Sequence, residues 1–127
     1  MDNNEKKLLS FLGIARKAGA LTVGAQLSLA AVKDKKAKLL IVARDASDNT
    51  RADCEKAKKW KKLTLLTLFS KQELGSVVGK EEVSVAAVTS REFADNVKRL
   101  AQQISEGEPQ QASQVNGGDA NDKIQST

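Results

Sequence analysis

Apolar residues recur at intervals of three and four positions in several segments of the chain, and this spacing predicts helices. The first predicted helix spans about residues 4–18, where Leu8 and Leu12 mark one face and Gly19 suits a left-handed helix end. A second helical pattern begins at Gly24 and ends in the basic run 33–38. The most regular stripe closes the periodic part of the chain and consists of Phe93, Val97, Leu100, Ala101 and Ile104.

Short apolar runs separate these helical patterns. Residues 39–43 form a continuous run that is too short for a core helix and typical of a strand buried on both faces. Residues 63–69 and 83–88 are the next strand candidates. Because strands alternate with helices, we predict an α/β protein with helices on both faces of a central sheet, a three-layer α-β-α sandwich.

Three of the predicted helix starts carry capping signals. Each has the spacing of a capping box, in which a Ser or Thr side chain caps the helix and an acidic residue three positions later bonds back. The pairs are Thr50 with Asp53, Ser70 with Glu73, and Thr89 with Glu92. Apolar residues flank the second and third pairs at the two positions of a hydrophobic staple, which strengthens the prediction that helices begin there.

The end of the chain differs in character from the rest. Residues 105–127 are rich in Gln, Ser, Gly, Asn and Asp, hold the single proline, and show no apolar period. Such a segment cannot bury enough apolar surface to offset its ordering entropy, so we expect a disordered polar tail after one domain spanning residues 1–104. The tail has a net charge of −3 and the domain a net charge of +8, which together give the chain's net charge of +5. This basic excess favours a polyanionic partner.

The composition excludes several kinds of chemistry. The 127-residue chain has no His and a single cysteine, Cys54, so it lacks a histidine-based triad, an internal disulfide and a CxxC metal site. It also lacks GxSxG, P-loop and GxGxxG motifs. We therefore expect no catalytic residue, no metal and no cofactor. Cys54 is expected to be a small apolar side chain that is buried or half-buried. No apolar run is long enough to span a bilayer, so a cytoplasmic location is expected.

Three segments have features of a binding surface. The helix start at Gly24 offers unpaired N–H groups, and basic residues precede and follow it in the sequence. The basic run 56–62 contains Trp60, which we expect to pack against the sheet, although stacking on a base is the alternative. The loops at 44–50 and 79–87 follow or precede strands, and loops at one edge of an open sheet often hold ligands.

Three motifs then suggest a family. Residues 13–19 with Gly24, residues 36–47, and residues 73–81 with Gly75 and Gly79 resemble, in order and spacing, the L-seven-Ae/L-thirty-e ribosomal protein family. Within it, the bacterial YlxQ-type members are the most similar. The resemblance covers about residues 5–104 and implies an L-thirty-e-like sandwich with a mixed sheet of about four strands. It also implies a non-catalytic RNA-binding protein whose partner is structured RNA, either rRNA or another kink-turn-like RNA.

The resemblance also suggests site residues. In archaeal and eukaryotic relatives a Gly-x-Asn-Glu-x-x-Lys signature at the second helix reads kink-turn RNA, and neighbouring loops enclose a flipped-out nucleotide. Ser47 and the segment 85–87 match those loops, and cations nearby are expected to contact phosphates. The expected RNA-binding residues are Arg16, Lys17, Gly24, Ala25, Gln26, Lys33, Lys36, Arg44, Asp45, Ser47, Val85, Ala86 and Ala87.

The chain departs from the signature at three positions. Gln26 replaces the Asn, Leu27 the Glu and Ala30 the Lys, so only the glycine is kept. Leu27 cannot accept a hydrogen bond from a base edge and Ala30 has no charge, so discrimination of about 1–3 kcal/mol per lost contact should disappear. A monomeric, ribosome-associated RNA-binding protein is the leading hypothesis. A protein-interaction module that has lost RNA specificity is the alternative, followed by an accessory domain that presents RNA to an enzyme.

Overall fold

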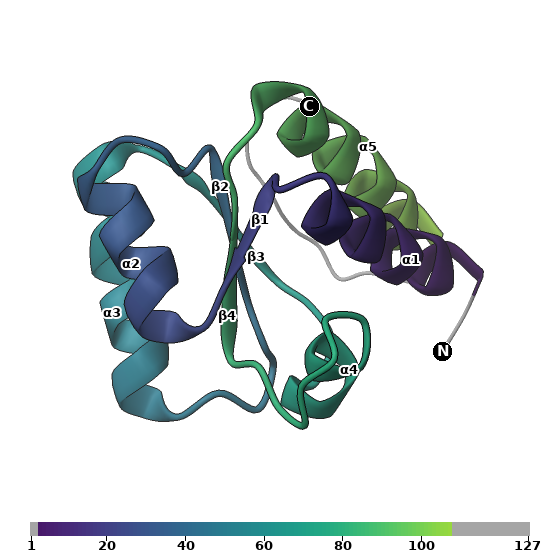
Figure 1. Ribbon diagram of the computed structural model, residues 1–127, viewed down its shortest axis with the longest axis horizontal. Coiled ribbons are helices and arrows are strands. Elements are labelled where there is room, and N and C mark those ends of the chain that lie inside the picture. The colour runs from purple at the N-terminus through teal and green to yellow at the C-terminus, as the bar shows by residue number, and fades with distance from the viewer. Residues whose placement is uncertain (1–2, 108–127) are drawn as a thin grey trace.

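The computed structural model describes residues 3–107, in which five helices and four strands alternate (Figure 1). The first three elements are α1 (Asn3–Lys17), β1 (Leu21–Val23) and α2 (Ala25–Lys33). The next three are β2 (Leu39–Val42), α3 (Asp48–Lys61) and β3 (Thr64–Thr67). The last three are α4 (Lys71–Ser76), β4 (Val85–Val88) and α5 (Arg91–Gly107). No helix within the described residues is long and apolar enough to cross a membrane.

The four strands form one mixed sheet in the order β1-β4-β2-β3. Strands β2 and β3 are parallel, whereas β4 runs antiparallel to both β1 and β2. It follows that β1, β2 and β3 share one direction. We call the edge where these three strands end the carboxyl edge, and the edge where they begin the amino edge. Strand β4 therefore enters the sheet at the carboxyl edge and leaves it at the amino edge.

Helices cover both faces of the sheet, which confirms the predicted three-layer sandwich. Figure 1 shows α2 and α3 on one face and α1 and α5 on the other, with α4 beside the carboxyl edge. All residues of β2 and β4 are at most 2% exposed, as the continuous apolar run 39–43 predicted. Phe11 of α1 and Phe93 of α5 stack with ring centroids 5.2 Å apart, so the two outer helices are held together by an aromatic pair.

The structure confirms one predicted helix cap and corrects two. The Ser70 hydroxyl accepts a hydrogen bond from the Glu73 N–H at 3.0 Å, and the Glu73 carboxylate accepts one from the Ser70 N–H at 2.9 Å. Helix α3, however, is capped by Ser47 rather than Thr50, because the Thr50 N–H donates to the Ser47 hydroxyl at 3.2 Å. Helix α5 is likewise capped by the Ser90 hydroxyl rather than by Thr89.

The reason for the shift from Thr89 to Ser90 lies in the sheet. The Thr89 N–H donates to the Ala20 carbonyl at 2.9 Å, so Thr89 still belongs to the strand ladder. Ser90 is the first residue free to cap, and its hydroxyl accepts from the Phe93 N–H at 3.4 Å. Helix α5 then continues to Gly107, beyond the predicted limit at 104. The remainder of the predicted polar tail lies outside the described residues.

The prediction for Trp60 is wrong, whereas that for Cys54 is confirmed. The inward face of α3 consists of Cys54, Ala57 and Lys61, which recur at helical spacing, and Trp60 falls outside that stripe and is 63% exposed. The Lys61 ammonium lies 4.1 Å from the centre of the Trp60 ring. Cys54 is fully buried, and burial, followed by the charges of Asp53 and Glu55, raises its pKa to about 11.

Candidate nucleic-acid interface

The start of α2 lies on the carboxyl edge, directly after β1. Gly24 has φ +99°, a conformation that favours glycine, and its N–H donates to the Val85 carbonyl at 2.8 Å. One turn later, the fully buried Ser28 hydroxyl donates to the Thr22 carbonyl at 3.2 Å. These bonds hold the first turn of α2 against β1 and the entry of β4.

The first N–H groups of α2 have no capping side chain. The Ser28 N–H makes the first bond of the helix, to the Gly24 carbonyl at 2.9 Å. Within residues 3–107, no hydrogen bond uses the N–H groups of Ala25, Gln26 and Leu27. Helices α3, α4 and α5 all begin with a serine cap, so the uncapped start of α2 leaves three donors and a positive dipole end on this edge.

The loop between β2 and α3 lies beside this helix start and is tightly anchored. The Ala43 N–H donates to the Ser84 carbonyl and the Arg44 N–H to the Phe69 carbonyl, each at 2.8 Å. The Asp45 carboxylate accepts a hydrogen bond from the Lys71 N–H at 2.8 Å. Asp45 therefore joins this loop to α4, and the Ser47 hydroxyl caps α3, so both predicted RNA contacts already have structural partners.

The strand predicted at residues 83–88 is present as β4, whereas the interpretation of residues 85–87 as part of a surface loop is wrong. Val85, Ala86 and Ala87 form β4 between β1 and β2, and their side chains are at most 1% exposed. The segment that reaches the carboxyl edge is the one before β4, residues 79–84. It is fixed by the Lys80 N–H, which donates to the Gly75 carbonyl at 3.0 Å, and by the Val83 N–H, which donates to the Lys71 carbonyl at 2.9 Å.

The predicted phosphate contacts do not join this site. Arg16 and Lys17 end α1, and the Arg16 guanidinium donates to the carbonyl of Leu21, the first residue of β1, at 3.2 Å. Lys33 ends α2 and Lys36 follows it, so both lie toward the amino edge. A helix of nine residues is about 14 Å long, which separates these lysines from the Gly24 start. The residues predicted from the sequence to bind RNA therefore lie on two surfaces.

Cations at the carboxyl edge are largely balanced by carboxylates. The Arg44 guanidinium lies 3.1 Å from the Glu5 carboxylate, and the Lys71 ammonium lies 4.0 Å from that of Glu82. The Arg44 side chain is still half exposed. This edge therefore offers backbone donors and one accessible guanidinium rather than a strong positive field.

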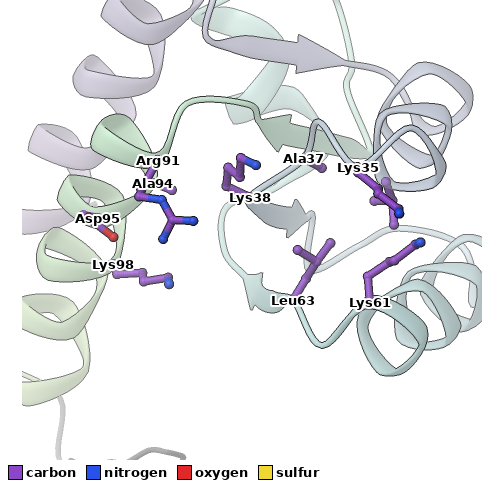
Figure 2. Close-up of a pocket in the computed structure, with 10 residues that line it drawn as sticks. Lys35, Ala37, Lys38, Lys61, Leu63, Arg91, Ala94, Asp95 and Lys98 are labelled. Carbon is purple, nitrogen blue, oxygen red and sulfur yellow. The ribbon is translucent and has the colours of Figure 1, made fainter.

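Sequence reasoning singled out the segments that hold Lys61 and Lys80, the basic run 56–62 and the loop 79–87, but not Lys71 at the carboxyl edge, nor Arg91 and Lys98 at the amino edge. The signal for Lys71 was the end of the strand at 63–69, because parallel strands end at the same edge as their neighbours. The amino-edge residues line a cavity that Figure 2 shows. Within residues 3–107, no group of three or more acidic or cysteine side chains is placed to hold a metal ion.

Comparison with known proteins places this architecture in a family. Residues 6–98 match the model of the Ribosomal protein L7Ae/L30e/S12e/Gadd45 family. RNA-binding protein YlxQ of Enterococcus faecium is 31% identical over 99 residues, which are 78% of this chain and 95% of that protein. RNA-binding protein YlxQ of Bacillus subtilis (strain 168) is 32% identical over 89 residues, 70% of this chain and 89% of that protein.

Solved structures have the same fold. A protein of unknown function from Bacillus halodurans C superposes with a TM-score of 0.72 at 27% identity, over 76% of this chain and 97% of that chain. The Giardia lamblia 15.5kD RNA binding protein superposes with a TM-score of 0.66 at 22% identity, over 84% of this chain and 91% of that chain, which shows the fold alone. With its sandwich, its strand order and these relatives, the chain belongs to the Ribosomal protein L7Ae/L30e/S12e/Gadd45 family.

Proposed function

We propose that this protein is a non-catalytic RNA-binding protein that contacts structured RNA through its carboxyl edge. Support comes from the family and from two relatives named as RNA-binding proteins, which this chain covers almost completely. The observation that carries the proposal is the uncapped start of α2 on the surface, flanked by the anchored segments 43–47 and 79–84. This is a rigid donor-rich surface of the kind that binds nucleic acid.

Each part of this edge has a distinct role. The N–H groups of Ala25, Gln26 and Leu27 suit a phosphate oxygen, because an anion at a helix start is stabilised by the dipole. The exposed Gln26 side chain carries an amide with both a donor and an acceptor, which suits a base edge. The half-exposed Arg44 guanidinium suits the backbone beside it. Lys80, exposed on the segment before β4, extends the contact.

More specifically, we propose that the bound RNA is kink-turn-like and that the protein is associated with the ribosome. The resemblance to kink-turn binders supports it, together with the position of Gly24 and Gln26 at the start of α2. Leu27, 63% exposed, and the exposed Ala30 occupy signature positions without the polar groups of the signature. We therefore expect kink-turn preference to be present but reduced, by about 1–3 kcal/mol for each missing good contact.

The test compares a labelled kink-turn RNA with the variants Gln26→Ala and Gln103→Ala. Gln103 is an exposed glutamine on α5, on the opposite face of the sheet from α2, and so serves as the matched control. We expect Gln26→Ala to weaken kink-turn binding about tenfold, near 1.4 kcal/mol, while Gln103→Ala leaves it unchanged. Equal affinities for wild type and both variants would remove the start of α2 from the RNA interface.

A protein-binding role is the second candidate, and Leu27 favours it. A leucine that is 63% exposed beside Gln26 is an apolar contact that RNA does not require. The two functions are separated by Leu27→Glu. This change restores a signature acceptor and should strengthen kink-turn binding, whereas it would abolish an apolar protein contact.

A further inference from the structure

Basic side chains converge on a cavity at the amino edge, across the sheet from the proposed RNA site. The cavity has a volume of about 290 Å³ and is lined by five cations and one carboxylate. Figure 2 shows Arg91 and Lys98 extending from α5 on one side and Lys35 and Lys61 on the other, with Lys38 and Leu63 between them. The carboxylate is Asp95, so the formal charge of the lining is +4.

The topology explains why these residues meet. Lys35 and Lys38 lie in the turn between α2 and β2, and the Lys38 N–H donates to the Val88 carbonyl at 2.7 Å. Lys61 ends α3. Arg91 and Lys98 are seven residues apart on α5, which places them two turns apart on one helix face. Segments distant in the sequence are thus brought together at the edge where β1, β2 and β3 begin.

These cations lack the carboxylate partners that cations have at the carboxyl edge. Among the side chains described, those of residues 3–104, none of the five cations forms an ion pair, whereas Arg44 and Lys71 each have one. Lys61 has only the face of Trp60, which leaves its charge uncompensated. Lys35 adopts φ +63°, in a turn position that favours glycine. Five like charges held in one cavity with a single carboxylate repel each other, and a bound anion relieves this repulsion.

The lining also indicates the class of anion. No lining residue is aromatic, so the cavity offers no platform for stacking a base. Lys and Arg side chains around a small opening suit phosphate oxygens. We propose that this cavity binds a backbone phosphate of duplex RNA and forms a second RNA contact. This second contact rests on the proposed function only because it takes RNA as the partner. Because α2 spans the sheet between the two edges, the two proposed RNA sites lie at opposite edges of the sheet.

The first experiment uses a labelled RNA duplex of about 20 base pairs without a kink-turn, titrated at several salt concentrations. The variant Lys38→Gln/Lys98→Gln removes two cavity charges. The matched control Lys6→Gln/Arg99→Gln removes two charges from exposed residues of α1 and α5 that do not line the cavity. We expect the cavity variant to lose about tenfold or more in affinity at 50 mM salt and the slope of log K against log salt to fall by up to about 0.9, the value for one phosphate contact. The control variant should keep most of the duplex affinity and most of the salt slope.

A second pair of variants separates binding from folding. Lys35→Gly and Lys62→Gly each remove one charge at a positive-φ position, with φ +63° and +56° in the parent, and only Lys35 lines the cavity. Both variants should melt at or above the wild-type temperature, because glycine relieves the left-handed conformation. Only Lys35→Gly should weaken duplex binding. Loss of binding in both, or in neither, would overturn the proposal.

Backbone amide NMR of the full chain locates the contact directly. On adding the duplex, we expect shift changes at residues 35–38, 61–63 and 91–98. Gln26→Ala should leave these changes intact, so failure of the carboxyl-edge site and failure of this proposal are distinguishable. Shift changes confined to residues 24–27 and 43–47 would overturn the second contact. Equal displacement of the duplex by polyglutamate would overturn it as well and indicate an acidic protein partner.

Discussion

Two helical glycines should respond in opposite directions to the same substitution. A Cβ atom added at Gly75 in α4 would lie 2.6 Å from the Lys80 carbonyl oxygen and 2.8 Å from the carbonyl carbon and oxygen of Glu81. A Cβ added at Gly13 in α1 would meet only Val77, at 3.6 Å from its carbonyl oxygen and 3.8 Å from its Cβ. The first distances are too short for atoms of a fixed backbone, whereas the second are ordinary van der Waals contacts.

The magnitudes follow from these distances. Replacing glycine by alanine within a helix contributes about 1 kcal/mol, so Gly13→Ala should stabilise the protein by roughly that amount. At Gly75 the same gain is opposed by overpacking of about 1–3 kcal/mol, and the clash is with backbone that cannot rotate aside. Gly75→Ala should therefore destabilise the protein by up to about 2 kcal/mol. The two variants should differ by about 1–3 kcal/mol in free energy of unfolding.

Urea unfolding followed by far-UV circular dichroism measures this difference. Fluorescence is a poorer probe, because the single tryptophan, Trp60, is already 63% exposed in the folded protein. With m values of about 1–3 kcal/mol per molar urea, the unfolding midpoints of the two variants should be separated by about 1–2 M. Equal midpoints, or a Gly75→Ala variant as stable as Gly13→Ala, would refute the close packing of α4 against the segment that enters β4.

Further predictions follow from the caps, the buried thiol and the signature. Ser90→Ala should lower the free energy of unfolding by about 1 kcal/mol in a thermal or urea melt, and Thr89→Ala by less, because the Ser90 hydroxyl caps α5. A larger loss for Thr89→Ala would show that Thr89 is the cap. Burial raises the Cys54 pKa from 9.0 to about 11, so the thiol stabilises the fold below pH 9 and this contribution is lost toward pH 11. Wild type should lose about 2–3 kcal/mol more than Cys54→Ala over that range in urea melts, and parallel losses would contradict the burial. Leu27→Glu/Ala30→Lys should strengthen kink-turn binding at least tenfold in a titration, and an unchanged affinity would show that these positions do not face the RNA.

The fold was largely predictable because its signals are local. The apolar run 39–43, the stripe on the last helix and the capping box of Ser70 with Glu73 each depend on neighbours in the sequence, and all three occur in the structure. The cap positions at Ser47 and Ser90 were missed because Ser and Thr residues within three positions of each other compete for one role. The outcome depends on which residue has left the strand ladder, and strand pairing is set by residues far away in the sequence.

The candidate site was harder to predict, because it depends on strand direction. Lys33 and Lys36 follow Gly24 by nine and twelve residues and were expected near it, but α2 carries them across the sheet. Segment 85–87 has small apolar residues that suit either a pocket loop or a buried strand, and only the order β1-β4-β2-β3 places it inside. The exposure of Trp60 likewise depended on which face of α3 meets the sheet, which Cys54 determines.

The central claim is that the carboxyl edge binds structured RNA with a remaining kink-turn preference. The most direct measurement is a titration of the full chain against a standard kink-turn RNA and a duplex of equal length, at two salt concentrations. The account predicts that the kink-turn binds at least tenfold more tightly, near 1.4 kcal/mol, and that this ratio persists at the higher salt while both affinities fall. Equal binding of the two RNAs at both salt concentrations would contradict it.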